Sequence, residues 1–563
     1  MIQSEQAAPR KPRLIERLLY GQGIDRDAKS RARIGVIILG FACVYAVIAG
    51  RMVYLGAASD GQQVRRASGD IVATARPDIL DRNGEVLATD VLLTATMPDM
   101  NAGELRERLS SRKGFVWLRR EITKAQREQI HRLGIPGIGF RSENKRVYPN
   151  GASVSHLIGH VNIDNQGIAG IEKWLDRNGL ADLHSLGFAN DRLQKPVELA
   201  LDLRVQHAMR AELLAARAKF KAKAAAGLVT DVNTGEIVAM VSVPDYDPND
   251  PREALDKDRI NRLTTGVFEM GSTFKALTVA MALDSGKYTL GSALDARQPL
   301  RYGRFTINDF HAQRRVLSLP EVFTYSSNIG TARMALGLGV EHHKQFLKKL
   351  GQLDRLRTEI PESAEPLVPR RWGELNTVTI AFGHGLSVAP LQAVMGINAL
   401  MNGGKLIPPT FLKRSEEEAA RLARQVVKPE TSLRMRYLMR LNAEKGSASR
   451  AEVKGFYVGG KTGTSEKVIN GRYSKSKLLT SFTAVLPADQ PKYLVLIMLD
   501  EPQPLAETKG YATSGWNAAP TAGKVIARIA PLLGIEPRFD LPPADQLILG
   551  VTASARAAKA VTR

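Results

Sequence analysis

One segment near the N-terminus constrains the fold more than any other part of the chain. Residues 34–50 run for 17 residues without a charged side chain, and apart from Arg51 the apolar character continues to Leu55. Seventeen helical residues span about 26 Å at ~1.5 Å each, close to the ~30 Å hydrocarbon core of a bilayer. Basic residues gather just before the segment, and the positive-inside rule places that side in the cytoplasm. We therefore predict a basic cytoplasmic tail over residues 1–33 and a transmembrane helix over residues 34–58.

Two other interpretations of this segment are weaker. One is a core helix of a soluble domain, and the other is a signal peptide cleaved after the small residues Gly56-Ala57-Ala58. The apolar run is long for a signal peptide, and Arg51 interrupts it just before the candidate cleavage site. No other stretch of the chain approaches ~18 apolar residues. We therefore expect a single span, with the bulk of the chain outside the membrane.

The composition of the chain limits the classes of protein to which the exported part can belong. Of the 563 residues, 44% are hydrophobic and 24% are charged, which excludes a mainly disordered chain, a collagen and a polytopic transporter. The net charge of +22 favours an anionic partner, such as nucleic acid, lipid headgroups or an anionic polymer. The alternative is that the charge only keeps the exported part in solution and forms a basic membrane-proximal tail. Cys43 is the one cysteine, so no intramolecular disulfide or Cys-based zinc site can form. His342 and His343 lack the i, i+4 spacing of a helical metal pair, and we predict no metal.

The exported part divides where the residue pattern changes near Pro196. Residues 59–195 combine β-rich runs at 86–88 and 91–97 with a helical stretch at 118–133 and several Pro/Gly turns. This mixture predicts a modest α+β pedestal. Residues 196–540 then form a larger domain. Residues 541–563, of which 551–563 are small and basic, are predicted to be a disordered tail.

The larger domain is predicted to hold one sheet. Two early β-rich runs are joined by the hairpin signal Asn233-Thr234-Gly235, and three more come late in the sequence. The expected strands cover residues 227–232, 236–243, 455–460, 480–486 and 493–499, and the expected helices include 205–222 and 518–533. Residues 260–445, between the two strand groups, have a helical pattern. This order predicts an α/β fold: a five-stranded antiparallel sheet with helices on its faces and an all-helical insertion.

Ser272 and Lys275 form the first candidate catalytic pair. They open a helical pattern, and their spacing of three places both side chains on one face of the helix. A serine hydroxyl is a weak nucleophile until a base takes its proton. A lysine can be that base only when it is neutral, which requires burial or a second nearby cation to lower its pKa. Taken alone this S-x-x-K pattern is weak, because an N-cap serine followed by a surface lysine has the same spacing.

A second polar motif, Ser326-Ser327-Asn328, follows the first by 54 residues. The Ser326 hydroxyl can carry a proton between a lysine and a leaving group, and the Asn328 amide can hold a substrate carbonyl. Taken alone, the motif is better explained as a polar cap of the next helix, expected over residues 330–336.

The third motif, Lys461-Thr462-Gly463-Thr464, is predicted to end a strand and lacks the spacing of a phosphate-binding loop. Gly463 has no side chain, so a substrate backbone can pair with the strand edge there. Lys461 can supply the second cation and bind a carboxylate. The backbone N–H of Thr464, together with that of Ser272, can form an oxyanion hole.

In this order, S-x-x-K, S-x-N and K-T-G resemble the signature set of the penicillin-binding proteins and serine β-lactamases. The similarity extends from about residue 60 to residue 530 and is closest to the cell-division branch of the class B penicillin-binding proteins. Met270 departs from the family, where many members have proline, and affects only the turn. The further matching segments are Arg76-Pro77, Asp81-Arg82-Asn83-Gly84, Arg146-Val147-Tyr148-Pro149, His156-Leu157-Ile158-Gly159, residues 167–172, Leu201-Asp202 with Gln206, residues 227–249, and Phe382-Gly383-His384-Gly385 with Ser387, Pro390 and Gln392.

The resemblance implies a penicillin-binding transpeptidase fold behind a class B pedestal. It implies that Ser272 is the nucleophile, Lys275 the general base and Ser326 the proton relay of a D,D-transpeptidase. The other implied site residues are Asn328 and Lys461, with Thr462, Gly463 and Thr464 for substrate and oxyanion binding. The substrates would be peptidoglycan stem peptides, cross-linked at the division septum through a serine acyl-enzyme, and β-lactam antibiotics would acylate the same serine. No cofactor and no nucleic-acid partner are implied.

The implied setting is the inner membrane, with the catalytic domain in the periplasm and an FtsW-type glycosyltransferase and other divisome proteins as partners.

Three alternatives to this function remain. A class B transpeptidase of the elongation complex has the same chemistry with another partner. A β-lactamase or D,D-carboxypeptidase needs neither the pedestal nor the anchor, and a β-lactamase also needs a deacylating carboxylate, for which Glu269 and Glu341 are candidates only by their nearness in sequence. A non-catalytic scaffold would not need all three motifs.

Overall fold

The computed structural model describes residues 38–49, 76–95, 124–134, 141–179, 195–303 and 305–546. The chain forms two compact units, Met1–Thr74 and Ala75–Arg563. In the first unit the described residues form one helix, residues 38–49, with exposed side chains. Within the described ranges, no helix has both the length and the apolar character needed to cross a bilayer. The predicted cytoplasmic tail, the candidate cleavage site and the remainder of the predicted span lie outside the described residues.

A five-stranded antiparallel sheet, in the order β13-β14-β15-β5-β6, is the centre of the second unit. The predicted five-stranded antiparallel sheet is therefore confirmed, including the early hairpin between β5 and β6. The strands are β5 (Ala224–Asp231), β6 (Ile237–Val243), β13 (Gly459–Ile469), β14 (Arg472–Leu486) and β15 (Tyr493–Asp500). Strand β13 lies at one edge of the sheet and is the strand that carries the K-T-G motif.

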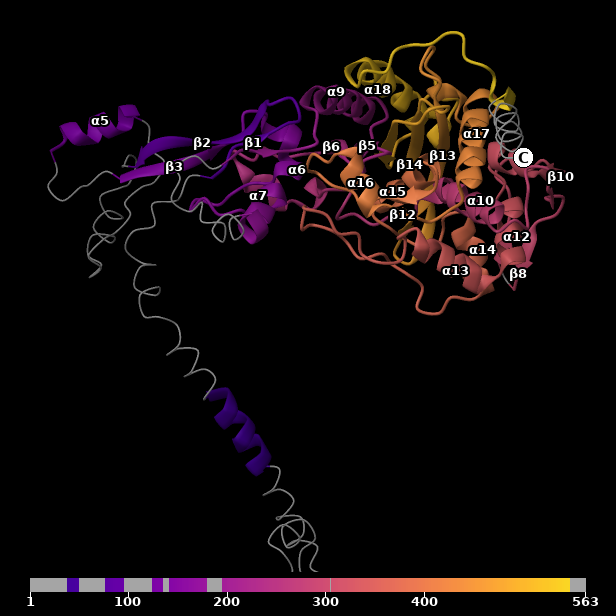
Figure 1. Ribbon diagram of the computed structural model, residues 1–563, viewed down its shortest axis with the longest axis horizontal. Helices are drawn as coiled ribbons and strands as arrows, with labels where there is room; N and C mark the ends of the chain where they lie inside the picture. The colour runs from indigo at the N-terminus through magenta and orange to yellow at the C-terminus, as the bar shows by residue number, and fades with distance from the viewer. Residues whose placement is uncertain are drawn as a thin grey trace, which may run out of the picture. The chain divides into compact units, whose positions relative to one another are not determined.

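Each face of the sheet packs on a separate hydrophobic core, because successive side chains of a strand point to opposite faces. In β15, Val495 and Ile497 belong to one core, whereas Leu494 and Leu496 belong to the other. Figure 1 shows α9 and α18 on one side of this sheet and α10 and α15 on the other. The helices that cover the two faces are α9 (Leu203–Lys219), α18 (Ala518–Leu532), α10 (Lys275–Asp284), α15 (Pro390–Met401) and α17 (Pro429–Lys445). The expected helices at 205–222 and 518–533 correspond to α9 and α18.

The region between β6 and β13 is not all-helical, and that part of the prediction is wrong. It contains three two-stranded sheets: β7 with β10, β8 with β9, and β11 with β12. The remaining elements of the region are α11 (Leu319–Thr324), α12 (Asn328–Leu338), α13 (Val340–Lys349), α14 (Glu374–Ala381), α16 (Glu416–Leu422), β7 (Ala293–Asp295), β8 (Leu300–Tyr302), β9 (Phe305–Ile307), β10 (Val316–Ser318), β11 (Lys405–Leu406) and β12 (Arg424–Gln425). Strands this short leave no measurable alternation in a sequence, and β7 and β10 pair across a gap of about 20 residues.

The pedestal contains a four-stranded sheet in the order β3-β2-β1-β4. The two β-rich runs expected at 86–88 and 91–97 are one strand, β2, and α5 lies inside the helical stretch expected at 118–133. The elements are β1 (Ile79–Leu80), β2 (Val86–Ala95), α5 (Lys124–Arg132), β3 (Arg141–Val147), α6 (Ser155–Ile158), α7 (Gly170–Trp174) and β4 (Val197–Glu198). The α+β character of the pedestal is as predicted.

The family-like motifs of the pedestal meet in a buried ion cluster around Glu172. The Arg76 Nε donates to Glu172 Oε2 at 2.9 Å, and the Arg146 Nε donates to Glu172 Oε1 at 2.7 Å. The side chains of Glu172 and Arg146 have no exposed surface, and that of Arg76 is 4% exposed. Asp90 and Asp176 pair with Arg146 and Arg76 at the margin of the cluster. These motif residues thus connect segments that lie between 26 and 100 residues apart in the sequence.

Further motif residues bind the pedestal to the larger domain. The fully buried Asp81 accepts hydrogen bonds from the backbone N–H of Asn83 and Leu203, at 2.8 and 3.0 Å. The amide of Gln206 joins the Ser153 carbonyl to the backbone of Met240. The pedestal and the start of α9 therefore form a continuous hydrogen-bonded structure.

Residues 541–546, which we assigned to the C-terminal tail, pack on the larger domain. Ala544 is fully buried, and the Tyr437 hydroxyl donates to Asp545 at 3.2 Å. The rest of the predicted tail lies outside the described residues.

Candidate active site

Ser272 lies in a single 3₁₀ turn, η6 (Gly271–Phe274), that leads directly into α10 at Lys275. The turn places Ser272 at the surface with partial exposure and places Lys275, three residues later, in the interior with 1% exposure. The expected helical spacing of the two residues is therefore present, although the α-helix itself begins only at Lys275.

Ser326 lies between α11 and α12 in an uncommon backbone conformation. Its φ angle is +57°, in the left-handed region that side chains other than glycine seldom adopt. Such conformations are typically retained at functional sites, where the surrounding structure holds them. The helix cap is the next residue, Ser327, whose hydroxyl accepts the Gly330 N–H at 3.0 Å. The cap explanation of this motif thus applies to Ser327, and Ser326 is free for another role.

Two buried lysines from separate motifs converge on the Ser326 hydroxyl. The Nζ atoms of Lys275 and Lys461 each lie 3.0 Å from Ser326 Oγ and donate to it. Lys275 also donates to the Ser326 carbonyl, and Lys461 to the Thr462 carbonyl at 3.3 Å. Neither lysine forms an ion pair with a carboxylate in the part of the chain that the structure describes. The structure therefore brings together three residues that lie up to 186 positions apart in the sequence.

Burial lowers the pKa of both lysines below that of an exposed lysine. Burial lowers the pKa of Lys461 to about 7. Burial, and then the charge of Lys461, lower the pKa of Lys275 well below its ordinary value, and the carboxylate of Asp309 opposes this only in part. A neutral amine at Lys275 can accept a proton, which a protonated lysine cannot do.

The K-T-G motif begins a strand, so the prediction that it ends one is wrong. Strand β13 starts at Gly459, whereas the expected strand at 455–460 is mostly a turn with φ angles of +89° at Gly455 and +46° at Tyr457. The apolar run 456–458 resembles a strand in composition, but positive φ angles are incompatible with extended pairing. The residues of the motif itself are polar and show no hydrophobic alternation, so no strand pattern is visible in the sequence where β13 begins.

Gly463 permits the 3₁₀ turn of Ser272 to pack against β13. A Cβ atom added at Gly463 would lie 2.4 Å from Thr273 Oγ1, 2.4 Å from Ser481 Oγ and 2.8 Å from the Met270 carbonyl. The two hydroxyls are 3.2 Å from each other and are hydrogen-bonded. The protein's own atoms thus occupy the space that a side chain at Gly463 would need. The sequence had instead suggested that a glycine here makes room for a substrate backbone.

Three of the remaining expected site residues are held by neighbouring groups. The Asn328 amide donates to the Asn308 carbonyl at 2.8 Å, which leaves one of its N–H groups for a ligand. The Thr462 and Ser447 hydroxyls are 2.7 Å apart, and Thr464 Oγ1 accepts the Ser514 N–H at 3.1 Å.

Sequence reasoning missed Asp309, which supports this site from a loop. Its carboxylate accepts the Ser327 hydroxyl at 2.7 Å and the Ile329 N–H at 2.9 Å, and its charge acts on Lys275. A single aspartate in a loop has no motif or periodicity, so only the folded chain reveals it.

The two glutamates considered as deacylating groups occupy different places. Glu269 is half-buried beside Ser272, where its Oε1 accepts the Gly385 N–H at 2.7 Å and the Tyr473 hydroxyl at 3.0 Å. Glu341 is exposed in the first turn of α13. Glu269, which was considered for its nearness to Ser272 in the sequence, therefore also lies beside Ser272 in the folded chain.

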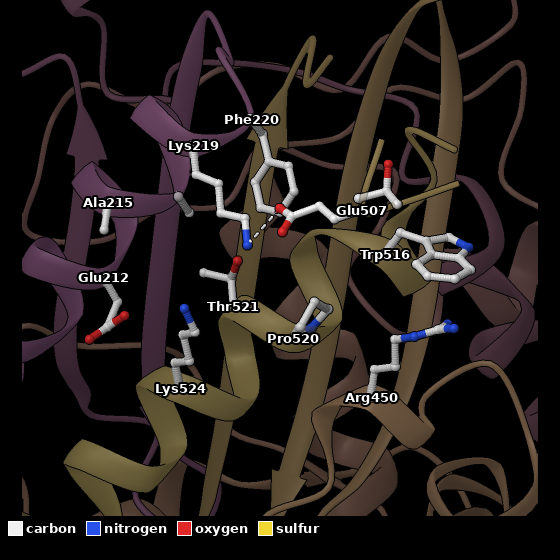
Figure 2. A pocket seen from close by; sticks show the side chains of 12 residues that line it. Glu212, Ala215, Lys219, Phe220, Arg450, Glu507, Trp516, Pro520, Thr521 and Lys524 are labelled. Carbon is white, nitrogen blue, oxygen red and sulfur yellow. Dashed lines mark ion pairs between the residues drawn. The ribbon is translucent and has the colours of Figure 1, made fainter. Parts of the chain in front are cut away.

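A separate pocket of about 270 Å³ lies on the other side of the sheet, between α9 and α18 (Figure 2). Lys219 and Glu507 form an ion pair of 2.8 Å across it, and the guanidinium of Arg450 lies 3.5 Å from the centre of the Trp516 ring. None of the predicted site residues lines this pocket.

Comparisons with known proteins agree with this geometry. The family model described as "Penicillin binding protein transpeptidase domain" matches residues 225–527, and the one described as "Penicillin-binding Protein dimerisation domain" matches residues 91–178. The chain is 40% identical over 505 residues to a protein of Caulobacter vibrioides named "Probable peptidoglycan D,D-transpeptidase FtsI", in an alignment that covers 84% of this chain and 83% of that protein. The chain belongs to the class B penicillin-binding proteins.

A second relative and a solved structure agree with this assignment, the first in sequence and the second in fold. It is 30% identical to "Peptidoglycan D,D-transpeptidase FtsI" of Escherichia coli, with 89% of this chain and 91% of that protein covered. The crystal structure of penicillin-binding protein 3 of Mycobacterium tuberculosis complexed with ampicillin superposes with a TM-score of 0.67, over 84% of this chain and 98% of that chain. At 23% identity this last likeness shows the fold alone. The family that the motifs suggested is thereby confirmed.

Proposed function

We propose that this chain is a peptidoglycan D,D-transpeptidase whose nucleophile is Ser272. The observation that carries the proposal is the convergence of two buried lysines on the Ser326 hydroxyl, next to the turn that presents Ser272. A chain that only bound peptidoglycan would gain nothing from two desolvated lysines, because burying an unpaired cation is costly. The names of the relatives supply the substrate class.

The proposed reaction proceeds through an acyl-enzyme. The Ser272 hydroxyl attacks the carbonyl carbon of the penultimate D-Ala of a stem peptide, and Lys275 takes the hydroxyl proton. Ser326 relays that proton to the leaving amine, the C–N bond breaks and the terminal D-Ala departs. An amine from a neighbouring stem peptide then attacks the ester, which forms the cross-link and restores the serine.

The edge strand β13 supplies the proposed substrate groove. Because only β14 pairs with β13 in the described sheet, the K-T-G backbone can pair with the extended stem peptide. In this proposal the N–H groups of Thr464 and Ser272 bind the oxyanion, and Asn328 holds a carbonyl with its remaining N–H. Thr462 and Lys461 bind the terminal carboxylate.

Penicillin should form a lasting ester with Ser272, because a β-lactam mimics the acyl-D-Ala-D-Ala end and its leaving group stays tethered. Intact-protein mass spectrometry is expected to show one adduct that persists for many minutes. Peptide mapping should locate the adduct on Ser272, and the Ser272→Ala variant should lack it. Rapid antibiotic turnover without an adduct would instead favour a β-lactamase, and no reaction at all would favour a scaffold.

The proposed setting is the division septum of the inner membrane, with one N-terminal span, a periplasmic catalytic domain and an FtsW-type glycosyltransferase among the divisome partners. The FtsI names of the relatives support the division role, and the uncharged run at residues 34–50 supports the anchor. A fluorescent fusion of the full chain is expected in the membrane fraction and at the septum of dividing cells. Deleting residues 1–58 should release a soluble protein that still binds penicillin. A uniform lateral signal would contradict the division role and favour the elongation complex.

A further inference from the structure

Beside Ser272 lies a second group of polar side chains that the proposed acylation step does not use. It consists of Glu269, three residues before Ser272, His384 in the turn between α14 and α15, and Tyr473 in β14. The Tyr473 hydroxyl donates to Glu269 Oε1 at 3.0 Å, and the His384 and Tyr473 rings meet edge to face with centroids 5.8 Å apart. We call these three residues the acceptor cluster.

Backbone contacts hold the acceptor cluster against the nucleophile. The Gly271 N–H donates to the Gly383 carbonyl at 3.2 Å, and a Cβ added at Gly383 would lie 1.9 Å from the Gly271 carbonyl oxygen. From the other side, the Ser465 hydroxyl of β13 donates to the Glu269 carbonyl at 2.6 Å. The cluster is therefore fixed between the glycine turn and the edge strand, next to Ser272.

The hydrogen-bonding capacity of the acceptor cluster is only partly used. Glu269 Oε1 accepts two hydrogen bonds, from Gly385 and Tyr473. Glu269 Oε2 and His384 Nδ1 are both buried, and neither has a hydrogen-bond partner among the described residues. Buried polar atoms are rarely left unpaired in folded proteins. The acceptor cluster therefore holds two polar atoms whose hydrogen bonds the described residues do not supply.

The chemistry of the acceptor cluster fits a cation. Burial, with the charge of Lys275, lowers the pKa of His384 to about 4, so its imidazole is neutral and has one accepting nitrogen at neutral pH. Burial raises the pKa of Glu269, which strengthens the affinity of its carboxylate for a proton. The Phe382 ring packs against His384 with ring centroids 5.4 Å apart. Carboxylate oxygens and aromatic faces attract an ammonium group.

We propose that Glu269 binds the primary ammonium of the acceptor stem peptide and takes its proton before the amine attacks the acyl-enzyme. This inference rests on the proposed transpeptidase function and names the second substrate of the same site. The ammonium gives one proton to Glu269 Oε2, and the neutral amine attacks the ester carbonyl carbon. The C–N bond forms, the C–Oγ bond to Ser272 breaks, and the second amine proton passes through Lys275 to Ser272 Oγ. The proton on Glu269 is finally released to water, so the step balances.

The test compares transfer with hydrolysis from one acyl-enzyme of the full-length protein in detergent. A thioester analogue of an acyl-D-Ala-D-Ala peptide acylates Ser272, and Nα-acetyl-lysine is the primary-amine acceptor. The ratio of amide to free acid, measured by mass spectrometry, is independent of the rate of acylation. Glu269→Gln is expected to lower this ratio by at least about tenfold, because a positioned general base contributes roughly 10²–10⁴-fold. The matched variant Glu341→Gln, at an exposed glutamate of the same domain, should leave the ratio unchanged.

Tyr473→Phe supplies a second, milder test. It removes the hydroxyl that orients Glu269 Oε1 and keeps the ring, so we expect the KM for Nα-acetyl-lysine to rise by about threefold, as for the loss of one hydrogen bond. An unchanged ratio in Glu269→Gln would overturn the inference, as would an equal loss in Glu341→Gln. If Glu269→Gln does not fold, an unchanged amine KM in Tyr473→Phe overturns it. A wild-type protein that the thioester does not acylate would refute the proposed function instead.

Discussion

Lys275→Arg is expected to abolish acylation of Ser272, with a loss of roughly 10²–10⁴-fold in the rate of penicillin binding. Lys275 is buried, and both its burial and the charge of Lys461 lower its pKa, so the wild-type side chain can be neutral and accept the serine proton. Arginine stays protonated in proteins and cannot act as this base. The second-order rate of adduct formation, measured by mass spectrometry, gives the effect directly.

Lys461→Arg is the matched control, because it changes the other lysine that contacts Ser326 Oγ at 3.0 Å. The cation is retained in this variant, and we expect a smaller loss of acylation than in Lys275→Arg. The wild-type rate should also decrease as the pH falls, since protonation of the lowered-pKa lysine removes the base. Equal losses in the two variants, or acylation retained in Lys275→Arg, would show that the base is misassigned.

The sequence predicted the architecture well where long, regular segments carry it. The strands β5, β6 and β15 are almost fully buried and mostly apolar. The helices α9 and α18 have helical patterns, so the sheet and its covering helices were foreseeable. The short pairs β7–β10 and β11–β12 were not, because two or three residues show no period and the pairing depends on tertiary contacts.

The candidate site could be foreseen from its motifs, but its geometry could not. Spacing placed Ser272 and Lys275 together, since three positions on a helix share a face. Ser326 takes a φ of +57° and leaves the helix cap to Ser327. Both features depend on packing, and no local sequence pattern predicts them. Asp309 and the unpaired Oε2 of Glu269 were likewise hidden, because their significance comes from neighbours distant in sequence.

The motif residues of the pedestal lead to a prediction about stability. Glu172→Gln is expected to destabilise the folded protein by about 3 kcal/mol, near the lower end of the 3–5 kcal/mol typical when one partner of a buried ion pair is removed. The substitution keeps the side-chain volume, so the loss of charge is isolated from cavity formation. Arg76 and Arg146 would both remain buried beside a neutral amide, although Asp176 and Asp90 still compensate them in part.

Glu198→Gln is the control for this prediction, because Glu198 forms an exposed ion pair with Lys413 at 2.6 Å. Exposed pairs contribute about 0–1 kcal/mol, since water and salt screen them. Urea unfolding of the full-length protein gives the free energies, and hydrogen exchange over residues 141–179 shows whether the loss is local to the pedestal. Similar destabilisation in both variants would mean that the cluster around Glu172 contributes no more than a surface ion pair. A loss confined to Glu172→Gln would show that these family-like arginine and glutamate positions serve to hold the pedestal together, at a distance from the chemistry of Ser272.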